Sequence, residues 1–380
     1  MLEFPTEISI TQILPFAVFA LFALCWIIQM IYYWAIYSRM AFYRKKPGES
    51  ARPPVSVVIC AKNEYQNLMK NLPVVLEQDY PDYEVIVVND ASDDDSIELL
   101  NSFTRKYKHL RIFDLERNLN FFSGKKFPLS LGIKSAKNEI VLLTDADCKP
   151  SSPNWISNMV SGYDAKTEIV LGYGTYRKTV GFLNQLIRYD SFLVAMQYMS
   201  YALAGSPYMG VGRNLSYKKS LFYNAKGFTA HYKLKSGDDD LFINRAATKV
   251  NTRIEISPDA HTVSSAKANL VQWILQKRRH FTTAKYYRPK FKFLLSLAYI
   301  SKLLLYLSFA ILIFLNYNLL ITLIAFSVFF TSHWVILALC TNKVRENDLA
   351  VLSPVLEILL LALSPIIYFS NVIIKQEKWK

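Results

Sequence analysis

Residues 55–90 read VSVVICAKNEYQNLMKNLPVVLEQDYPDYEVIVVND, and this stretch decides the fold. It opens with a continuous apolar, β-branched run at Val55–Ala61 and closes with a second one at residues 84–88. Between the two runs, from Leu68 to Leu76, apolar residues recur at the spacing of one helical face. Short apolar strands joined by a helix are typical of a buried parallel sheet, so we expect a βαβ unit here.

The same alternation continues towards residue 147. The further elements that we predict are a helix around residues 97–103, a strand at 110–115, a helix around 129–136 and a strand at 140–143. Strands and helices that alternate at this spacing indicate the α/β class, with a doubly wound, largely parallel sheet.

Polar residues follow three of these strands at the point where each strand ends. They are Lys62, Asn63 and Glu64; Asn89 and Asp90; and Asp145 and Asp147. Because ligands bind at the carboxyl ends of the strands in such sheets, these side chains mark the candidate site. The sequence has no GxGxxG or Walker loop, which disfavours a Rossmann dehydrogenase or a P-loop ATPase.

Residues 10–37 carry no charge and are long enough to cross a hydrocarbon core of about 30 Å. No basic region precedes them and no small-residue cleavage site is evident, so we expect a membrane anchor and not a cleaved signal peptide. Glu3 and Glu7 precede the segment, whereas a basic cluster from Arg39 to Arg52 follows it. The positive-inside rule therefore places the middle of the chain in the cytoplasm.

Three more apolar segments lie at about residues 294–317, 319–340 and 349–374. A basic stretch from Lys277 to Lys292 precedes them, which again favours a cytoplasmic position for the middle of the chain. The last segment contains a glutamate and two prolines, and strict alternation would leave the lysines of the tail outside. This segment is therefore expected to span the membrane, to be re-entrant or to lie at the interface.

We predict three parts: an anchor with a basic linker at 1–50, an α/β domain at 51–290 and a membrane region at 291–380. The formal net charge is +14, but much of it lies in the two juxtamembrane clusters, where anionic lipid headgroups would be. Nucleic acid is therefore not an expected partner. The four cysteines show no paired spacing, which implies neither a disulfide framework nor a zinc site.

Two acidic clusters suit catalysis. Asp145 and Asp147 could bind Mg²⁺ or Mn²⁺ and leave positions open for diphosphate oxygens, although such a pair can equally be solvated or cap a helix. Asp238, Asp239 and Asp240 stand in a row before an apolar helix start. One N-cap needs only one acid and three acids repel one another, so one of them is a candidate general base near a cation.

Two later segments leave alternatives open. In the segment WILQKRRH at 273–280, the basic residues either face anionic lipid, or Gln276 and Arg279 meet a departing diphosphate. Residues 182–203 mix aromatic and aliphatic side chains with few charges. They predict either a helix at the membrane surface or a buried core helix.

Six motifs occur in one order across residues 53–280: PPVSVVICAKNE, VIVVNDASDDDS, TDADC, GVGRNLSYKK, SGDDDLF and QKRRH. Together they resemble the family 2 inverting glycosyltransferases, which have a GT-A fold. The resemblance implies a hexosyltransferase that moves a sugar from a nucleotide diphosphate donor, by family habit a UDP-sugar, with the help of Mg²⁺ or Mn²⁺.

The resemblance also implies roles for residues at matching positions. The expected donor-binding residues are Ala61, Glu64 and Asp90 for the uridine, Lys125 for the nucleotide or its phosphates, and Gln276 and Arg279 for the diphosphate. Asp145 and Asp147 would form the DxD motif that places the metal, and Gly212, Arg213 and Asn214 would line the sugar and acceptor pocket. Asp239 would be the catalytic base, with Asp238 or Asp240 as alternatives one register away.

His280 stands where the QxxRW motif of the polymer-forming members has Trp, a residue that helps to bind the acceptor. The change disfavours processive polymer synthesis, because histidine offers less apolar area for stacking on a sugar.

We therefore expect an integral protein of a bacterial inner membrane, with a cytoplasmic catalytic domain. It would add a sugar to a membrane lipid or a lipid-linked glycan, in outline like ceramide glucosyltransferase. A processive polysaccharide synthase and a non-catalytic subunit of a membrane glycan-assembly complex are the alternatives.

Overall fold

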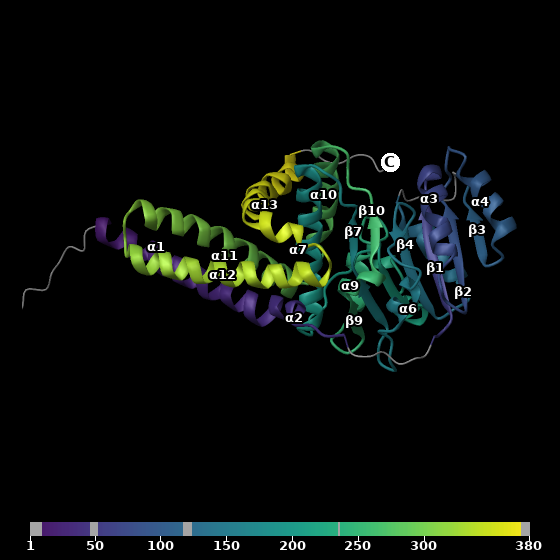
Figure 1. The fold of residues 1–380 in the computed structure, drawn as a ribbon, viewed down its shortest axis with the longest axis horizontal. Coiled ribbons are helices and arrows are strands. Elements are labelled where there is room, and N and C mark those ends of the chain that lie inside the picture. The colour runs from purple at the N-terminus through teal and green to yellow at the C-terminus, as the bar shows by residue number, and fades with distance from the viewer. Residues whose placement is uncertain (1–9, 46–51, 117–123, 235, 374–380) are drawn as a thin grey trace, which may run out of the picture.

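The computed structural model describes residues 10–45, 52–116, 124–234 and 236–373. An α/β domain forms one end of the molecule, and long apolar helices extend from it to the other end (Figure 1). The α/β domain and the apolar helices, which hydropathy distinguishes along the sequence, are therefore also separate in space.

A seven-stranded sheet forms the centre of the α/β domain, in the order β3-β2-β1-β4-β8-β6-β9. Its strands are β1 (Val55–Ala61), β2 (Tyr83–Asn89), β3 (Leu110–Asp114), β4 (Ile140–Asp145), β6 (Ile169–Gly172), β8 (Leu215–Lys218) and β9 (Thr252–Glu255). Neighbouring strands are parallel except at β8, which runs antiparallel to both β4 and β6. The predicted α/β class and largely parallel sheet are confirmed.

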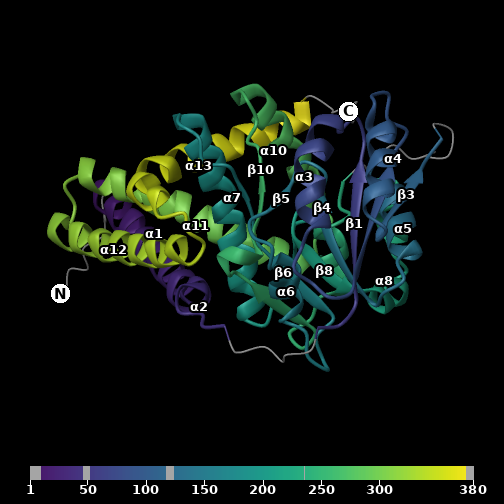
Figure 2. The same ribbon diagram turned by 45° about the vertical axis from the view of Figure 1, so that its right-hand side comes forward.

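Helices cover both faces of this sheet (Figure 2). They are α3 (Tyr65–Leu76), α4 (Ser96–Lys106), α5 (Lys126–Ser135), α6 (Trp155–Val160), α8 (Lys219–Asn224) and α9 (Asp240–Ala246). Helix α10 (Leu270–Ala284) lies away from the sheet and packs on the C-terminal helix. Val57 of β1 belongs to the apolar cluster that includes α3, whereas Val58 belongs to the one that includes α5. A Cβ on Gly132 of α5 would lie 2.5 Å from Val58 Cγ1, so a glycine is required where this helix meets the sheet.

A second, three-stranded sheet joins β5 (Lys149–Pro150), β10 (Thr262–Ser264) and β7 (Gly174–Tyr176). The sequence analysis did not predict these strands, nor β6, β8 and β9, because strands of two to four residues are too short to show a periodic pattern. β5 follows β4 after a three-residue turn, so this small sheet lies beside the carboxyl end of the large one.

The predicted anchor is one continuous helical stretch formed by α1 (Ile10–Ile31), the π-helix η1 (Tyr32–Tyr37) and α2 (Ser38–Ala41). It ends four residues beyond the predicted 10–37. The other membrane helices are α11 (Pro289–Phe314), α12 (Leu319–Lys343) and α13 (Asp348–Ile373). All four stretches are long and apolar enough to cross a membrane, so the chain is a membrane protein.

Helix α7 (Phe182–Leu203) joins the two ends of the molecule. It packs on β7 and β9 on one side and on η1, α2 and α13 on the other. Phe182 is its one exposed residue. Of the two alternatives for this segment, the structure shows the buried core helix.

A buried ion-pair network fastens α7 to the turn between α12 and α13. Arg188 is 2% exposed, and its guanidinium donates to Glu346 and Asp348, with an Nη1 to Asp348 Oδ2 distance of 2.7 Å. Thr175 of β7 donates a further hydrogen bond to Glu346. Lys178 Nζ lies 2.8 Å from Asp348 Oδ1. The network thus connects the membrane helices to the small sheet of the α/β domain.

We predict that Arg188→Ala lowers the free energy of unfolding by about 3–5 kcal/mol, because it removes the buried cation that pairs with Glu346 and leaves only the more distant, exposed Lys178. Arg253→Ala removes the solvent-exposed partner of Asp164 and should cost about 0–1 kcal/mol. Thermal unfolding of the two purified variants in detergent checks this difference. Equal melting temperatures would contradict a structural role for the network.

Candidate active site

The carboxyl ends of β1, β2 and β4 bring the first group of predicted residues together. Ala61, the last residue of β1, is buried, and its carbonyl accepts a hydrogen bond from the Asp90 amide at 2.8 Å. The Asp90 side chain is buried as well, and Lys62 Nζ lies 3.8 Å from its Oδ2. Ala61 and Asp90 are therefore buried side by side at the edge where β1 and β2 end.

Glu64 caps the start of α3 from the same edge, and Asn67 Nδ2 donates to its Oε2 at 2.5 Å. Its partial burial raises its pKa, and the negative charges of Asp147 and Asp145 add to the shift. Glu64 therefore shares one electrostatic environment with the acidic pair, as its predicted position implies.

Asp145 ends β4 and Asp147 follows it in the turn. Burial opposes ionisation of Asp145, but the adjacent Lys125 ammonium outweighs it and lowers the pKa of Asp145 below its ordinary value. Burial and the charge of Asp145 raise the pKa of Asp147. The side-chain ligand atoms of Asp145, Asp147 and Cys148 all lie within 4.8 Å of one another, so the turn gathers potential metal ligands.

Two arginines surround the acidic pair from other parts of the chain. Arg213 lies in the turn before β8, and its guanidinium stacks 4.5 Å above the ring centre of Tyr176. Its Nη2 donates to Ser191 of α7 at 3.1 Å. Arg279 of α10 acts electrostatically on Asp145, as Arg213 does, and both favour its ionised form. The site therefore holds at least three cations that can meet an anionic ligand.

Tyr176 of β7 occupies a central place that the sequence analysis missed. Its ring supports Arg213, and its hydroxyl accepts a hydrogen bond from Gln276 Nε2 at 3.3 Å. Tyr176 thus links the arginine near the acidic pair to α10, which carries Gln276 and Arg279. A tyrosine in a three-residue strand gives no sequence signal of its own, because only tertiary contacts bring it to the site.

The three consecutive acids have three different environments. Asp240 is buried and accepts hydrogen bonds from the hydroxyls of Thr283 and Tyr287, the latter at 2.8 Å. Its carboxylate therefore fastens α9 to α10 and to the start of α11. Asp238 lies close enough to Lys125 to favour its protonated form. The environment of Asp239 differs from those of Asp238 and Asp240.

Asp239 is the N-cap of α9, and its carboxylate accepts hydrogen bonds from the amides of Gly212 at 2.8 Å and Asp240 at 2.7 Å. Burial, followed by the charges of Asp238 and Asp240, raises its pKa to about 7. A carboxyl group with this pKa can accept and release a proton near neutral pH. Gly212 is thereby placed against Asp239, as expected for residues of one pocket.

Asn214 is fully buried behind the site. Its amide group donates to the carbonyls of Tyr173 and Ala260 at 2.9 and 2.7 Å, and its Oδ1 accepts from the Trp155 indole at 3.1 Å. These bonds join the two sheets to α6. The Asn214 side chain thus supports the frame next to Arg213 and has no free group for a ligand.

His280 is exposed at the side of the site. Desolvation of the ring by the surrounding protein lowers the pKa of His280 to about 3, and the positive charges of Arg279, Lys277 and Arg213 add to the shift. The imidazole is therefore neutral at physiological pH, and it offers an uncharged, polar ring where the related motif has an indole.

Comparison with known proteins agrees with this geometry. Residues 56–229 match the family model described as glycosyl transferase family 2. These residues therefore form a domain of the glycosyl transferase family 2 type.

Among the curated relatives, an uncharacterised glycosyltransferase of Haemophilus influenzae is 26% identical over 172 residues, which are 45% of this chain and 49% of that protein. A poly-β-1,6-N-acetyl-D-glucosamine synthase of Staphylococcus epidermidis is 34% identical over 125 residues, 32% of this chain and 29% of that protein. The chain thus spans half or less of the length of these relatives.

Among solved structures, a mannosyltransferase of Pyrobaculum calidifontis, in complex with GDP-mannose and Mn²⁺, superimposes with a TM-score of 0.57 at 22% identity. The match covers 88% of this chain and 98% of that one. The match shows that the chain has the GT-A fold that the resemblance implied.

Lys126 is a second residue of this site that the sequence analysis did not single out. It is buried, and its Nζ donates to the carbonyls of His231, Leu234 and Ser236, at 2.5, 2.9 and 2.8 Å. The Lys126 ammonium thus holds together three backbone carbonyls that shortly precede the three acids. Gly237 follows this loop at φ +98°, a conformation that L side chains rarely adopt.

We predict that Lys126→Met loosens this loop, because a hydrogen bond to a charged group contributes about 1.5–3 kcal/mol and three of them are lost. Chymotrypsin should then cleave after Tyr232 faster than in the unsubstituted protein. Lys134→Met is the matched control, because Lys134 is exposed on the same helix. Similar cleavage rates in the two variants would refute the role of Lys126.

Proposed function

We propose that the glycosyltransferase inverts the anomeric centre of a nucleotide diphosphate sugar and transfers the sugar to a membrane lipid or lipid-linked glycan. One observation carries the proposal. A carboxyl group with a pKa of about 7, that of Asp239, shares a site with an acidic pair and three cations. This is the set of groups that base-assisted displacement of a diphosphate requires.

We assign the donor to the edge formed by β1, β2 and β4. Ala61, Glu64 and Asp90 would bind the nucleoside, where a buried carbonyl and carboxylates can accept hydrogen bonds from a base and a ribose. Lys125 and Arg279 would meet the phosphates, because both act electrostatically on Asp145. We favour uridine as the base, and the donor panel below tests it against guanosine.

The acidic pair fits a divalent cation. Asp145 and Asp147 are carboxylates close enough to share one ion. Burial, followed by the negative charge of Asp145, raises the pKa of Asp147, and a cation bound between them would offset that charge. Cys148 is a poor ligand for Mg²⁺ or Mn²⁺, because these ions prefer oxygen, and its Sγ lies 3.3 Å from Asp147 Oδ1. Bound there, the ion would supply positive charge for the diphosphate oxygens.

The chain's own residues then carry out the chemistry. Asp239 removes the proton from an acceptor hydroxyl, and that oxygen attacks the anomeric carbon on the face opposite the diphosphate. Arg279 and Arg213 stabilise the charge that develops as the diphosphate departs. One such displacement inverts the anomeric centre.

The choice of Asp239 among the three acids rests on their partners. Asp240 is engaged with Thr283 and Tyr287, and Asp238 acts on Lys125. Asp239 is held by two backbone amides, which fix the orientation of its carboxylate while leaving the rest of its lone pairs for a proton.

A lipid acceptor is supported by the position of α10. Leu270, Val271 and Leu275 on this helix are exposed apolar residues, and the same helix carries Gln276, Arg279 and His280. Apolar surface beside the reaction centre suits an acceptor that arrives from the membrane. We place the domain on the cytoplasmic face of a bacterial inner membrane, on the strength of the flanking basic clusters.

We predict that the detergent-purified protein releases nucleoside diphosphate only with a divalent cation, one sugar donor and one lipid acceptor. A panel of UDP- and GDP-sugars with extracted bacterial lipids tests this. Asp239→Asn should lower the rate by about 10²–10⁴-fold and retain donor binding by calorimetry, because the base acts only on the acceptor proton. Release at the unsubstituted rate in Asp239→Asn would overturn the assignment.

The size of the product and the dependence of release on a metal ion distinguish the proposed transferase from the alternatives. A glycolipid with one added sugar supports the proposal, whereas a high-mass polymer would identify a processive synthase, the activity named for the staphylococcal relative. Chelation with EDTA should stop release, and added Mn²⁺ or Mg²⁺ should restore it. Absence of both release and donor binding under every condition would point to a non-catalytic subunit.

We further predict that kcat/KM rises with pH up to about 7 and then levels off. A base must be deprotonated to act, and burial holds the pKa of Asp239 at about 7, so the active fraction falls about tenfold per pH unit below that value. Initial rates between pH 5 and 9 at low donor concentration measure this profile. A flat profile through pH 6–8 in the unsubstituted protein would exclude Asp239 as the group that titrates.

A further inference from the structure

Helix α13 is apolar and 26 residues long, yet both of its ends are bound to the catalytic domain. At its first residue, Asp348 accepts hydrogen bonds from Arg188 of α7, with Nη1 at 2.7 Å. Near its last residue, Asn371 exchanges two hydrogen bonds with Arg278 of α10, at 3.0 and 2.9 Å. α7 and α10 both belong to the catalytic domain.

The middle of α13 contacts the membrane helices. Glu357 is buried, and its carboxylate pairs with Lys302 of α11 and with His333 of α12. At 1.5 Å per residue, His333 lies about 15 Å along α12 from the end near the catalytic domain, which is half of a hydrocarbon core of about 30 Å. Glu357 therefore lies near the mid-depth of the bundle.

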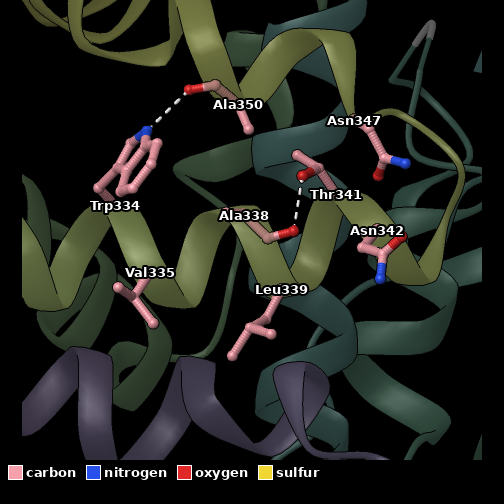
Figure 3. Close-up of a pocket in the computed structure, with 8 residues that line it drawn as sticks. All are labelled: Trp334, Val335, Ala338, Leu339, Thr341, Asn342, Asn347 and Ala350. Atoms are coloured by element: carbon pink, nitrogen blue, oxygen red, sulfur yellow. Dashed lines mark hydrogen bonds between the residues drawn. The ribbon is translucent and has the colours of Figure 1, made fainter.

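The start of α13 lies beside the end of α12. The indole of Trp334 on α12 donates to the Ala350 carbonyl at 3.0 Å, and Asn342 and Asn347 flank the turn between the helices (Figure 3). The opposite ends of α11 and α12 meet at residues 315–318, at the end of the bundle far from the catalytic domain (Figure 1).

A straight helix of this length would extend about 39 Å and would place its last residue near residues 315–318. Asn371 instead contacts Arg278, so α13, which packs on α12 and on α7, ends beside α10 (Figure 2). Pro354 and Pro365 lie inside the helix, where each removes a backbone hydrogen bond and permits a bend.

We propose that α13 is a re-entrant helix, which enters the membrane from the catalytic side, reaches about mid-depth at Glu357 and returns to the same side. The glycosyltransferase then crosses the membrane three times, through the anchor, α11 and α12. By topology, three crossings would leave both the basic turn after α12 and the lysines after residue 374 on the catalytic side. This arrangement satisfies the positive-inside rule that four crossings would break.

The outer face of α13 contacts lipid. After Asp348 at its start, its exposed residues are apolar or aromatic: Val351, Val355, Ile358, Ala362, Ile366, Tyr368 and Phe369. The opposite face is covered by α7, α10 and α12. A helix at a water interface would expose a polar face, so the apolar stripe indicates acyl chains and not headgroups as its neighbours.

Cysteine labelling tests the topology without any need for enzymatic activity. Single cysteines are placed in a background where the four native cysteines are replaced by serine or alanine, and intact cells are treated with a membrane-impermeant maleimide before and after permeabilisation. Lys166→Cys reports the catalytic domain, because Lys166 is exposed there, and Asn316→Cys reports the opposite end of the bundle. Lys378→Cys is the site under test.

We expect Lys378→Cys to label under the same condition as Lys166→Cys and opposite to Asn316→Cys. Labelling together with Asn316→Cys would show a fourth crossing and overturn the proposal. Fusions of green fluorescent protein after residue 378 and after residue 316 give a second reading, since this protein fluoresces only when it stays in the cytoplasm. Fluorescence from the first fusion alone supports a re-entrant α13, and loss of fluorescence from the first refutes it.

Discussion

The balance of charge at one edge of the sheet is the constraint on which the rest of the structure depends. Glu64, Asp145 and Asp147 meet the loop of Asp238 and Asp239 there, and so many carboxylates cannot ionise together without cations. Lys125 and Lys126 come from the start of α5, Arg213 from the turn before β8 and Arg279 from α10. The site exists only when these distant elements are held in place together.

The membrane region helps to hold them. The charge of Arg279 acts on Asp145 because α10 is fixed on two sides. The Lys277–Asp190 pair joins it to α7, and the Arg278–Asn371 hydrogen bonds join it to α13. The Arg188 network fastens the same helices to β7, whose Tyr176 supports Arg213. Each arginine of the site therefore depends on contacts that continue into the membrane helices.

Much of the fold could be predicted because its signals are local. β1 was predicted to the residue, and β2, β3 and β4 to within two residues, because buried parallel strands are continuous apolar runs. The short strands β5 to β10 were missed, since two to four residues carry no periodicity. Among the site residues, the acids were visible as clusters, but the sequence could not distinguish Asp238, Asp239 and Asp240. Only the hydrogen-bond partners show that Asp240 connects helices and that backbone amides orient the carboxylate of Asp239.

The sequence by itself determined the class of the protein, its membrane segments and the acidic residues of its site, because hydropathy, strand–helix alternation and motif spacing are properties of neighbouring residues. Only the tertiary structure decided that Asn214 supports the frame, that Tyr176 and Lys126 contact residues of the site and that the end of α13 is bound to α10. The physical reason is common to all of these. Burial, a shifted pKa and a hydrogen bond arise between residues far apart in the chain, and no local pattern specifies them.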